Sequence, residues 1–236
     1  MSVSEKYGRT RHYPFSPGTT SDDRINKDYW NDLQLIATLV HTEKLDGENN
    51  CLSRHGVFAR SHAAPTISPW TATLRQYWYS IKNDLGDLEI FLENCYAVHS
   101  LKYNNLDHHF YVFAVREHKI WLSWEETKFY AAMINLPVVP EIGLIETPPN
   151  KADFEQSVMK IVAGPGAFSP TDIITGEISC MEGIVSRSAG CYLQQDFQHK
   201  VFKYVRKGHV KTGEHWTRNW ARAPLKREGG KHVEDS

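Results

Sequence analysis

The sequence predicts a mixed α+β fold that is rich in antiparallel sheet. Short runs of branched and aromatic residues, separated by tight turns, outnumber strand-helix alternations. The chain has 236 residues, of which 41% are hydrophobic, so it can form a real core in one large or two small domains. No run reaches the roughly 18 apolar residues of a membrane span, and the N-terminus lacks a signal peptide. We therefore expect an intracellular, cytoplasmic protein.

The N-terminal part reads as an extension followed by strands. Residues 1–27 are polar, contain two prolines and show no sustained period. The apolar run 35–43 follows, and residues 49–62 contain a His-Gly break between two short strand-like runs. This pattern is typical of a hairpin, and it places Lys44 on a loop between strands.

Three helices are predicted, over residues 68–86, 123–136 and 151–164, and the second stops before Pro137. The first has Ser68 as N-cap, Pro69 at the first helical position and Gly86 as terminator. The second begins with a capping box formed by Ser123 and Glu126. Runs rich in branched and aromatic residues predict further strands within residues 88–94, 109–122, 180–194 and 199–210.

Charge is distributed unevenly along the chain. The net charge is only −1, but residues 1–199 carry 17 Lys+Arg against 24 Asp+Glu, whereas residues 200–236 carry 10 against 4. This asymmetry indicates a polyanionic partner near the C-terminus or, alternatively, a merely solvated basic tail. The four cysteines are widely spaced and the histidines are scattered, so the sequence predicts neither a disulfide framework nor a zinc site.

The run EKLDGENN, residues 43–50, contains a candidate nucleophile. Lys44 precedes an Asp-Gly pair, and the carboxylates of Glu43, Asp46 and Glu48 could organise a divalent ion or a ribose. A lysine attacks only as the neutral amine, so its reference pKa of about 10.4 must be offset by a nearby cation, a metal or burial. Asp-Gly is also a common turn, so a solvated lysine at a hairpin tip is the alternative.

Further unusual runs follow in order along the chain. They are KLDGEN with Lys44 and Asn49, FARSH with Arg60, FLENCYAVHSLKY with Glu93, FYVFAV with Phe113, MEGIV with Glu182, and VFKYVRK with Lys203. In this order and spacing, the chain resembles the covalent lysine nucleotidyltransferases. Asn49 at the sixth position of the first motif favours their RNA ligase 2 branch over DNA ligases and capping guanylyltransferases.

The resemblance implies a role for each matched residue. Lys44 would attack the α-phosphorus of ATP, and Lys203 and Arg60 would neutralise the phosphate charge. Glu93 would contact the ribose and Phe113 would stack on the adenine. The implied nucleotide-binding set is completed by Glu43 near the adenine amino group, by Asp46, Gly47 and Asn49 of the first motif, and by Glu182, which would also hold Mg²⁺ or Mn²⁺.

The family also implies an activity and an organisation of the chain. We expect an ATP-dependent RNA ligase that acts as a monomer and joins 3′-hydroxyl and 5′-phosphate RNA ends through lysyl-AMP and RNA-adenylate intermediates. Its fold would be an ATP-grasp-like adenylation domain with flanking helices. We expect an N-terminal extension packed on this domain at 1–30, the adenylyltransferase domain at 31–207, and a basic and aromatic tail without a separate C-terminal domain at 208–236.

Three departures keep alternatives open. Ala114 stands where the branch usually has an acidic residue, and Val205 stands where the last motif usually has a second lysine. Only 29 residues follow Lys207, and we expect Trp216 and Trp220, among lysines and arginines, to supply a strand-binding surface there. The alternatives are a DNA ligase, a guanylyltransferase, or a nucleotide- or RNA-binding module that has lost full activity.

Overall fold

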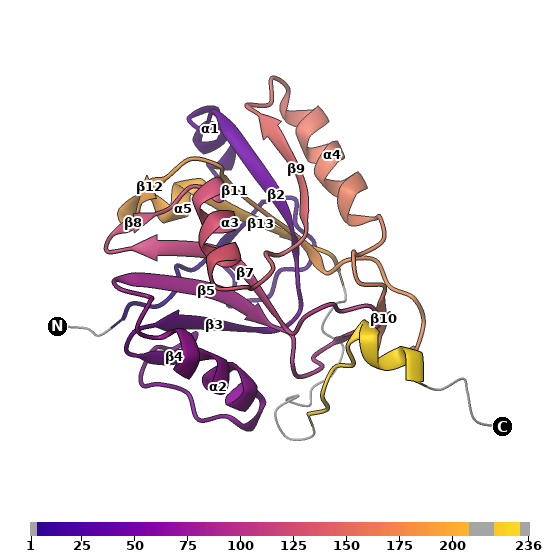
Figure 1. Cartoon of the computed structure of the whole chain (residues 1–236). Coiled ribbons are helices and arrows are strands. Elements are labelled where there is room, and N and C mark those ends of the chain that lie inside the picture. Colours follow the sequence, from indigo (N-terminus) through magenta and orange to yellow (C-terminus); the bar gives the residue numbers. More distant parts are fainter. Residues whose placement is uncertain (1–3, 208–219, 232–236) are drawn as a thin grey trace.

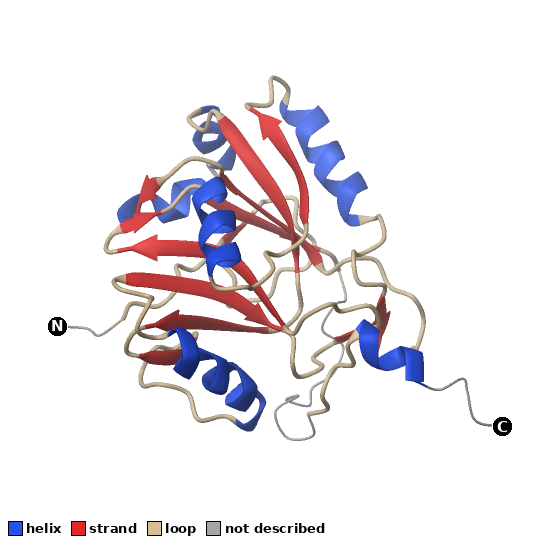
Figure 2. Cartoon of the chain, viewed as in Figure 1, coloured by secondary structure: helices blue, strands red, loops and turns tan. Residues whose placement is uncertain are grey.

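The computed structural model describes residues 4–207 and 220–231, and Figure 1 shows how its helices and strands are arranged. Two antiparallel-rich sheets form the body of the molecule, and helices cover their outer faces (Figure 2). The predicted α+β fold is confirmed. None of the helices in this part of the chain has the length and apolar character that crossing a membrane requires.

The five-stranded sheet has the order β1-β13-β11-β2-β9, and all its ladders are antiparallel except β1 with β13. Its strands are β1 (Arg11–His12), β2 (Thr38–Lys44), β9 (Glu141–Glu146), β11 (Gly183–Ser188) and β13 (Val201–Val205). The six-stranded sheet has the order β12-β8-β7-β5-β3-β4. Its strands are β3 (Glu48–Ser53), β4 (Gly56–Ala59), β5 (Leu88–Asn94), β7 (Phe110–Glu117), β8 (Ile120–Trp121) and β12 (Tyr192–Leu193). A small third sheet pairs β6 (Leu101–Tyr103) with β10 (Pro170–Asp172).

The core lies in three layers around these sheets. Between the two large sheets, Val40, Phe91, Phe113 and Val201 pack in one cluster. The outer face of the five-stranded sheet is covered by α1 (Tyr29–Gln34) and α4 (Lys151–Val162), and that of the six-stranded sheet by α2 (Ala72–Ile81) and α3 (Trp124–Met133). The remaining helical segments are η1 (Pro69–Thr71), η2 (Gln194–Asp196), α5 (Phe197–Lys200) and η4 (Lys226–Lys231). Burial of apolar faces on both sides explains why both sheets are rich in branched and aromatic residues.

The first predicted helix is shorter than the sequence indicates. Ser68 makes no side-chain cap, Pro69 opens the 3₁₀ turn η1, and α2 ends at Ile81. The chain then turns so that Leu85, 1% exposed, reaches the core, and Gly86 occupies the left-handed region at φ +54°, two residues before β5. Gly86 therefore terminates this turn and not the helix.

The second helix begins as predicted. The Ser123 side chain accepts the N–H of Glu126, and the Glu126 side chain accepts the N–H of Ser123, so the capping box is confirmed. The helix ends before the predicted boundary because Asn135, at φ +50°, adopts a left-handed conformation. The third helix forms as α4, and Asn150 caps its N-terminus by accepting two backbone N–H groups.

The placement of Lys44 on a hairpin loop is wrong. Lys44 is the last residue of β2, and its backbone is the ladder partner of Gly183 in β11. The strand after it, β3, belongs to the other large sheet, so residues 45–47 carry the chain from one sheet to the next. The His-Gly break does form a hairpin, between β3 and β4. Sequence periodicity detects strands, but it does not show which sheet a strand joins.

The N-terminal extension and the C-terminal segment both lie on the domain. In the extension, β1 adds to the edge of the five-stranded sheet through its parallel pairing with β13. At the other end, Trp220 lies 6.3 Å from the Trp70 ring, and Arg222 forms a 2.7 Å ion pair with Glu228. Of the expected strand-binding tail, residues 208–219 and 232–236, which include Trp216, lie outside the described residues.

Candidate active site

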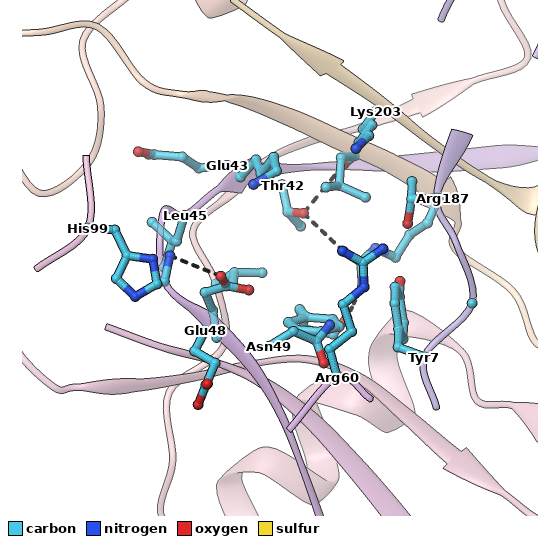
Figure 3. A pocket seen from close by; sticks show the side chains of 18 residues that line it. Tyr7, Thr42, Glu43, Leu45, Glu48, Asn49, Arg60, His99, Arg187 and Lys203 are labelled. Carbon is cyan, nitrogen blue, oxygen red and sulfur yellow. Dashed lines mark hydrogen bonds between the residues drawn. The ribbon is translucent and has the colours of Figure 1, made fainter. Parts of the chain in front are cut away.

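A cavity of about 520 Å³ lies where the two large sheets meet. Residues of β2, β11 and β13 line it from one sheet, and residues of β3, β5 and β7 line it from the other. Figure 3 shows Arg60, Arg187 and Lys203 around the same open space, beside Tyr7 of the N-terminal extension. The cavity thus combines several positive side chains with an aromatic wall.

Lys44 reaches into this cavity from the end of β2. Its Nζ donates a hydrogen bond to Glu182 Oε2 at 2.8 Å, and the Lys44 side chain is 26% exposed. Burial lowers the pKa of Lys44, but the carboxylates of Glu182, Glu93 and Asp46 outweigh this effect and raise it above its usual range. The resting amine is therefore protonated, and attack by this group requires its carboxylate neighbours to be drawn away or neutralised.

Glu182 lies immediately before β11, opposite the end of β2. Burial raises the pKa of Glu182 to about 7, against the opposing charge of Lys44. The next residue, Gly183, is the ladder partner of both Lys44 and Val205. A Cβ at Gly183 would lie 2.0 Å from the carbonyl oxygen of Tyr204, so only glycine allows β11 and β13 to approach this closely.

Glu93 and Gly47 form a second contact beside the lysine. The N–H of Gly47 donates to Glu93 Oε1 at 3.0 Å, and burial raises the pKa of Glu93 to about 8. A Cβ at Gly47 would lie 2.7 Å from the carbonyl oxygen of Asn94, which explains the glycine. Asn49 is the ladder partner of Glu93, so the first and third motifs meet across β3 and β5.

Asp46 holds the loop that follows Lys44. Its Oδ2 accepts the N–H groups of Ser100 and Leu101 at 2.7 and 2.8 Å, while its own N–H donates to the Tyr103 hydroxyl at 2.7 Å. These three bonds fix residues 45–47 against residues 100–103. Asp46 therefore acts on the nucleophile through backbone position and through its charge.

Phe113 forms part of the cavity wall and part of the core. It is 7% exposed, and Tyr7 meets its ring edge-on at a centroid distance of 5.1 Å. The guanidinium of Arg187 lies 5.8 Å from the same ring centroid, donates to the Phe113 carbonyl oxygen, and lines the cavity. Sequence reasoning missed Arg187. The available signal was the period of two along β11, which puts Val185 and Arg187 on one face.

Lys203 is held by a residue of the N-terminal extension. Its Nζ donates to Asp23 Oδ1 at 3.1 Å, and the same oxygen lies 3.0 Å from His12 Nε2. Burial lowers the pKa of Lys203, against the opposing effect of Asp23. Sequence reasoning also missed Asp23, because no local pattern links residues 180 positions apart. Val205, where a second lysine was expected, is buried under Ser16 and Gly18.

Glu43 points away from the group around Lys203, as Figure 3 shows. Its Oε2 accepts the N–H of Ala167 at 2.8 Å, and a Cβ at Gly166 would lie 2.8 Å from Oε1. Burial raises the pKa of Glu43 to about 7. This position, on the side of β2 opposite Lys44, puts the carboxyl group against the 166–167 turn.

A family model described as RNA ligase matches residues 37–205. The chain belongs to the RNA ligase family. All the motif residues from Lys44 to Lys203 lie inside the matched segment, which confirms the resemblance seen in the sequence. No curated protein sequence matches the chain.

Solved structures of ligases share the fold of this RNA ligase family member. An RNA ligase variant from Naegleria gruberi, solved with ATP and manganese, has 16% identity and a TM-score of 0.55, over 87% of this chain and 57% of that one. An archaeal ATP-dependent RNA ligase has 15% identity and a TM-score of 0.52, over 85% and 48%. A putative ATP-dependent DNA ligase from Aquifex aeolicus has 17% identity and a TM-score of 0.50, over 85% and 50%. The chain thus spans about half the length of these proteins.

The RNA ligase family member brings most of its motif residues to one cavity. The cavity is lined by eight of them: Glu43, Lys44, Gly47, Asn49, Arg60, Glu93, Phe113 and Lys203. Glu182 accepts a hydrogen bond from Lys44, which lines the cavity. The Glu43 and Asp46 carboxylates are engaged with backbone N–H groups outside the cavity. The structure adds Arg187 as a lining cation and Asp23 as the partner of Lys203.

Proposed function

We propose that the protein is an ATP-dependent RNA ligase that joins 3′-hydroxyl and 5′-phosphate RNA ends. The observation that carries this proposal is the position of Lys44 Nζ, in a cavity that also presents Arg60, Arg187 and Lys203. One amine among several cations suits attack on a triphosphate, because the cations offset charge on the phosphate oxygens. Relatives named as RNA ligases, one of them solved with ATP and manganese, support the choice of substrates.

In the first step, the Lys44 amine attacks the α-phosphorus of ATP. A nitrogen-phosphorus bond forms, the bond to the pyrophosphate oxygen breaks, and the amine loses its proton. Lys203, whose Nζ is held 3.1 Å from Asp23 Oδ1, is positioned so that its positive charge offsets the negative charge of the phosphate oxygens. Arg187, fixed by its bonds to the Phe113 carbonyl and the Thr42 hydroxyl, provides a second fixed cation. Displacement of this kind depends more on positioning and charge than on acid-base catalysis.

A divalent ion, Mg²⁺ or Mn²⁺, fits beside Glu182. This carboxylate is 2% exposed and has oxygen donors of the kind that hard cations prefer. In the part of the chain that the structure describes, no group of three or more His, Cys, Asp or Glu side chains forms a metal site. Glu182 would therefore hold the ion together with phosphate oxygens and water. When bound, the ion supplies positive charge that favours the neutral form of the nearby amine.

In the second step, a 5′-phosphate oxygen of RNA attacks the phosphorus of lysyl-AMP, and the bond to Lys44 breaks. In the third, the 3′-hydroxyl attacks the 5′-phosphate, AMP leaves, and the hydroxyl proton is released. The RNA ends and the nucleotide use the same cavity. We propose that the protein acts as a monomer. The four free cysteines suit a reducing compartment such as the cytoplasm, which we propose as the setting.

The test is transfer of label from α-labelled ATP, with magnesium, to the protein on a denaturing gel. The parent protein should be labelled, and Lys44→Ala should not be, while Lys128→Ala, on the surface of α3, should match the parent. Label from GTP would indicate a guanylyltransferase, and sealing of a DNA nick but not an RNA nick would indicate a DNA ligase. A parent protein that binds ATP but takes no covalent label would leave only a nucleotide-binding module.

A further inference from the structure

The cavity around Lys44, Arg60, Arg187 and Lys203 is called the nucleotide cavity below. Two further cavities continue from it along the N-terminal segment. The second, of about 520 Å³, shares Tyr7 and Gly8 with the nucleotide cavity. The third, of about 460 Å³, shares Arg9, Gln194 and Phe197 with the second. The three cavities are therefore neighbours in a row that begins at the cavity lined by Lys44 and Lys203.

The third cavity is lined by Arg9, Arg11 and Arg24, with three glutamines and Phe197 completing its wall. It has no acidic side chain in this lining. Arg9 donates to the carbonyl oxygen of Asp22 at 3.2 Å, and Arg11 donates to the side-chain oxygen of Gln198. Among residues 4–207 and 220–231, none of the three arginines forms an ion pair with a carboxylate. Their guanidinium groups retain donors for an anionic ligand.

The backbone that carries these arginines is fixed relative to Lys203. Arg11 and His12 form β1, which pairs with Phe202 and Lys203 of β13. A Cβ at Gly8 would lie 2.4 Å from the Phe197 ring, so the segment packs tightly on α5. Arg11 thus lies on the edge strand β1, next to the strand that carries Lys203, and Arg24 is held beside it because its carbonyl oxygen accepts the N–H of His12.

We propose that this arginine groove, formed by Arg9, Arg11 and Arg24, binds the phosphate backbone of the RNA strand whose end enters the nucleotide cavity. The inference rests on the proposed function and adds the path of its polymeric substrate. A row of arginines beyond the nucleotide cavity suits a ligand with phosphates at regular intervals. The ring of Phe197 is 5% exposed and cannot stack on a base, so the groove contacts backbone and not sequence.

The test compares RNA affinity in parent, Arg9→Ala/Arg11→Ala/Arg24→Ala, and a control with the same change in charge, Arg54→Ala/Lys82→Ala/Lys128→Ala. The control residues lie outside the three cavities. The probe is a fluorescent single-stranded RNA with a 5′-phosphate, titrated at several salt concentrations without ATP. Each lost phosphate contact lowers the salt slope of log K by roughly 0.7 for a single strand, so the triple variant should lose about 2 in slope. At 0.1 M salt this corresponds to about 100-fold weaker binding.

Lysyl-AMP formation separates the two claims. If the parent forms no lysyl-AMP, the proposed function fails. If the groove variant forms lysyl-AMP as the parent does and binds RNA as tightly as the control variant, the groove inference alone fails. Arg9→Ala/Arg24→Ala, which spares the bond from Arg11 to Gln198, serves if the triple variant does not fold, and it should lose about 25-fold in affinity at 0.1 M salt. A loss of affinity that equals the control's would also refute the groove.

Discussion

Substitution of Gly183 by alanine tests whether close approach of β11 and β13 holds the active site together. The new Cβ would lie 2.0 Å from the Tyr204 carbonyl oxygen, where 3.4 Å is an ordinary contact, so the strands must separate by about 1.4 Å. Overpacking of this kind costs roughly 1 to 3 kcal/mol in the free energy of unfolding. For a chain of this size, this lowers the midpoint of thermal unfolding by roughly 2 to 12 °C.

The same displacement should slow the chemistry. Gly183 follows Glu182 and is the ladder partner of Lys44, so separation of the strands moves both members of the ion pair. A misplacement of about 1 Å can cost roughly 100-fold in rate. We expect slower lysyl-AMP formation by Gly183→Ala, measured by quenched-flow labelling with α-labelled ATP at a temperature where the variant is folded.

The matched control is Gly143→Ala in β9 of the same sheet. A Cβ at Gly143 meets nothing within 4 Å, so its unfolding free energy should stay within about 0.5 kcal/mol of the parent value. Circular dichroism melting curves of the three proteins provide the comparison. If Gly183→Ala melts and reacts as Gly143→Ala does, the close approach of the strands is not what constrains this position, and the reasoning is refuted.

Two further predictions concern charge. Asp23→Asn should slow lysyl-AMP formation by an amount that grows with pH, because the pKa of Lys203 falls further without the carboxylate that raises it. Rate profiles from about pH 6 to 9 measure this effect, and Asp22→Asn is the control. A deficit that is constant with pH would contradict it. Glu43→Gln should raise the melting temperature at pH 8 more than at pH 4.5. Burial raises the pKa of Glu43 from 4.5 to about 7, so the protonated acid stabilises the fold below pH 4.5, and this contribution, roughly 1 to 3 kcal/mol, is lost as pH rises through 7. Equal melting shifts at the two pH values would exclude this role for burial.

Much of the site could be predicted because its signals are local. The capping box at Ser123 depends on residues within one helical turn, and it formed as expected. The motif residues lie on strands or beside their ends, where a short sequence fixes both the backbone and the direction of a side chain. Gly47 and Gly183 can be explained in the same way, because each stands where another strand's carbonyl oxygen leaves no room for a Cβ.

The features that the sequence did not predict depend on contacts across long separations. Whether Lys44 ended a strand or lay on a hairpin depended on β11, nearly 140 residues later. Asp23 acquires a role only because β1 brings the extension against β13. Arg187 lines the cavity because the two sheets face each other there. Local propensity contains no information about any of these pairings.

The ion pair between Lys44 and Glu182 also affects how readily Lys44 is modified by compounds other than its substrate. Aldehydes, activated thioesters and other electrophiles modify lysines as free bases, so the carboxylate at 2.8 Å, which favours the ammonium form, slows such modification. Lys44 in its ammonium form has no lone pair with which to attack such compounds. Under the proposed function, selectivity for ATP would then begin before adenine is recognised, because a triphosphate that carries a divalent cation can neutralise Glu182.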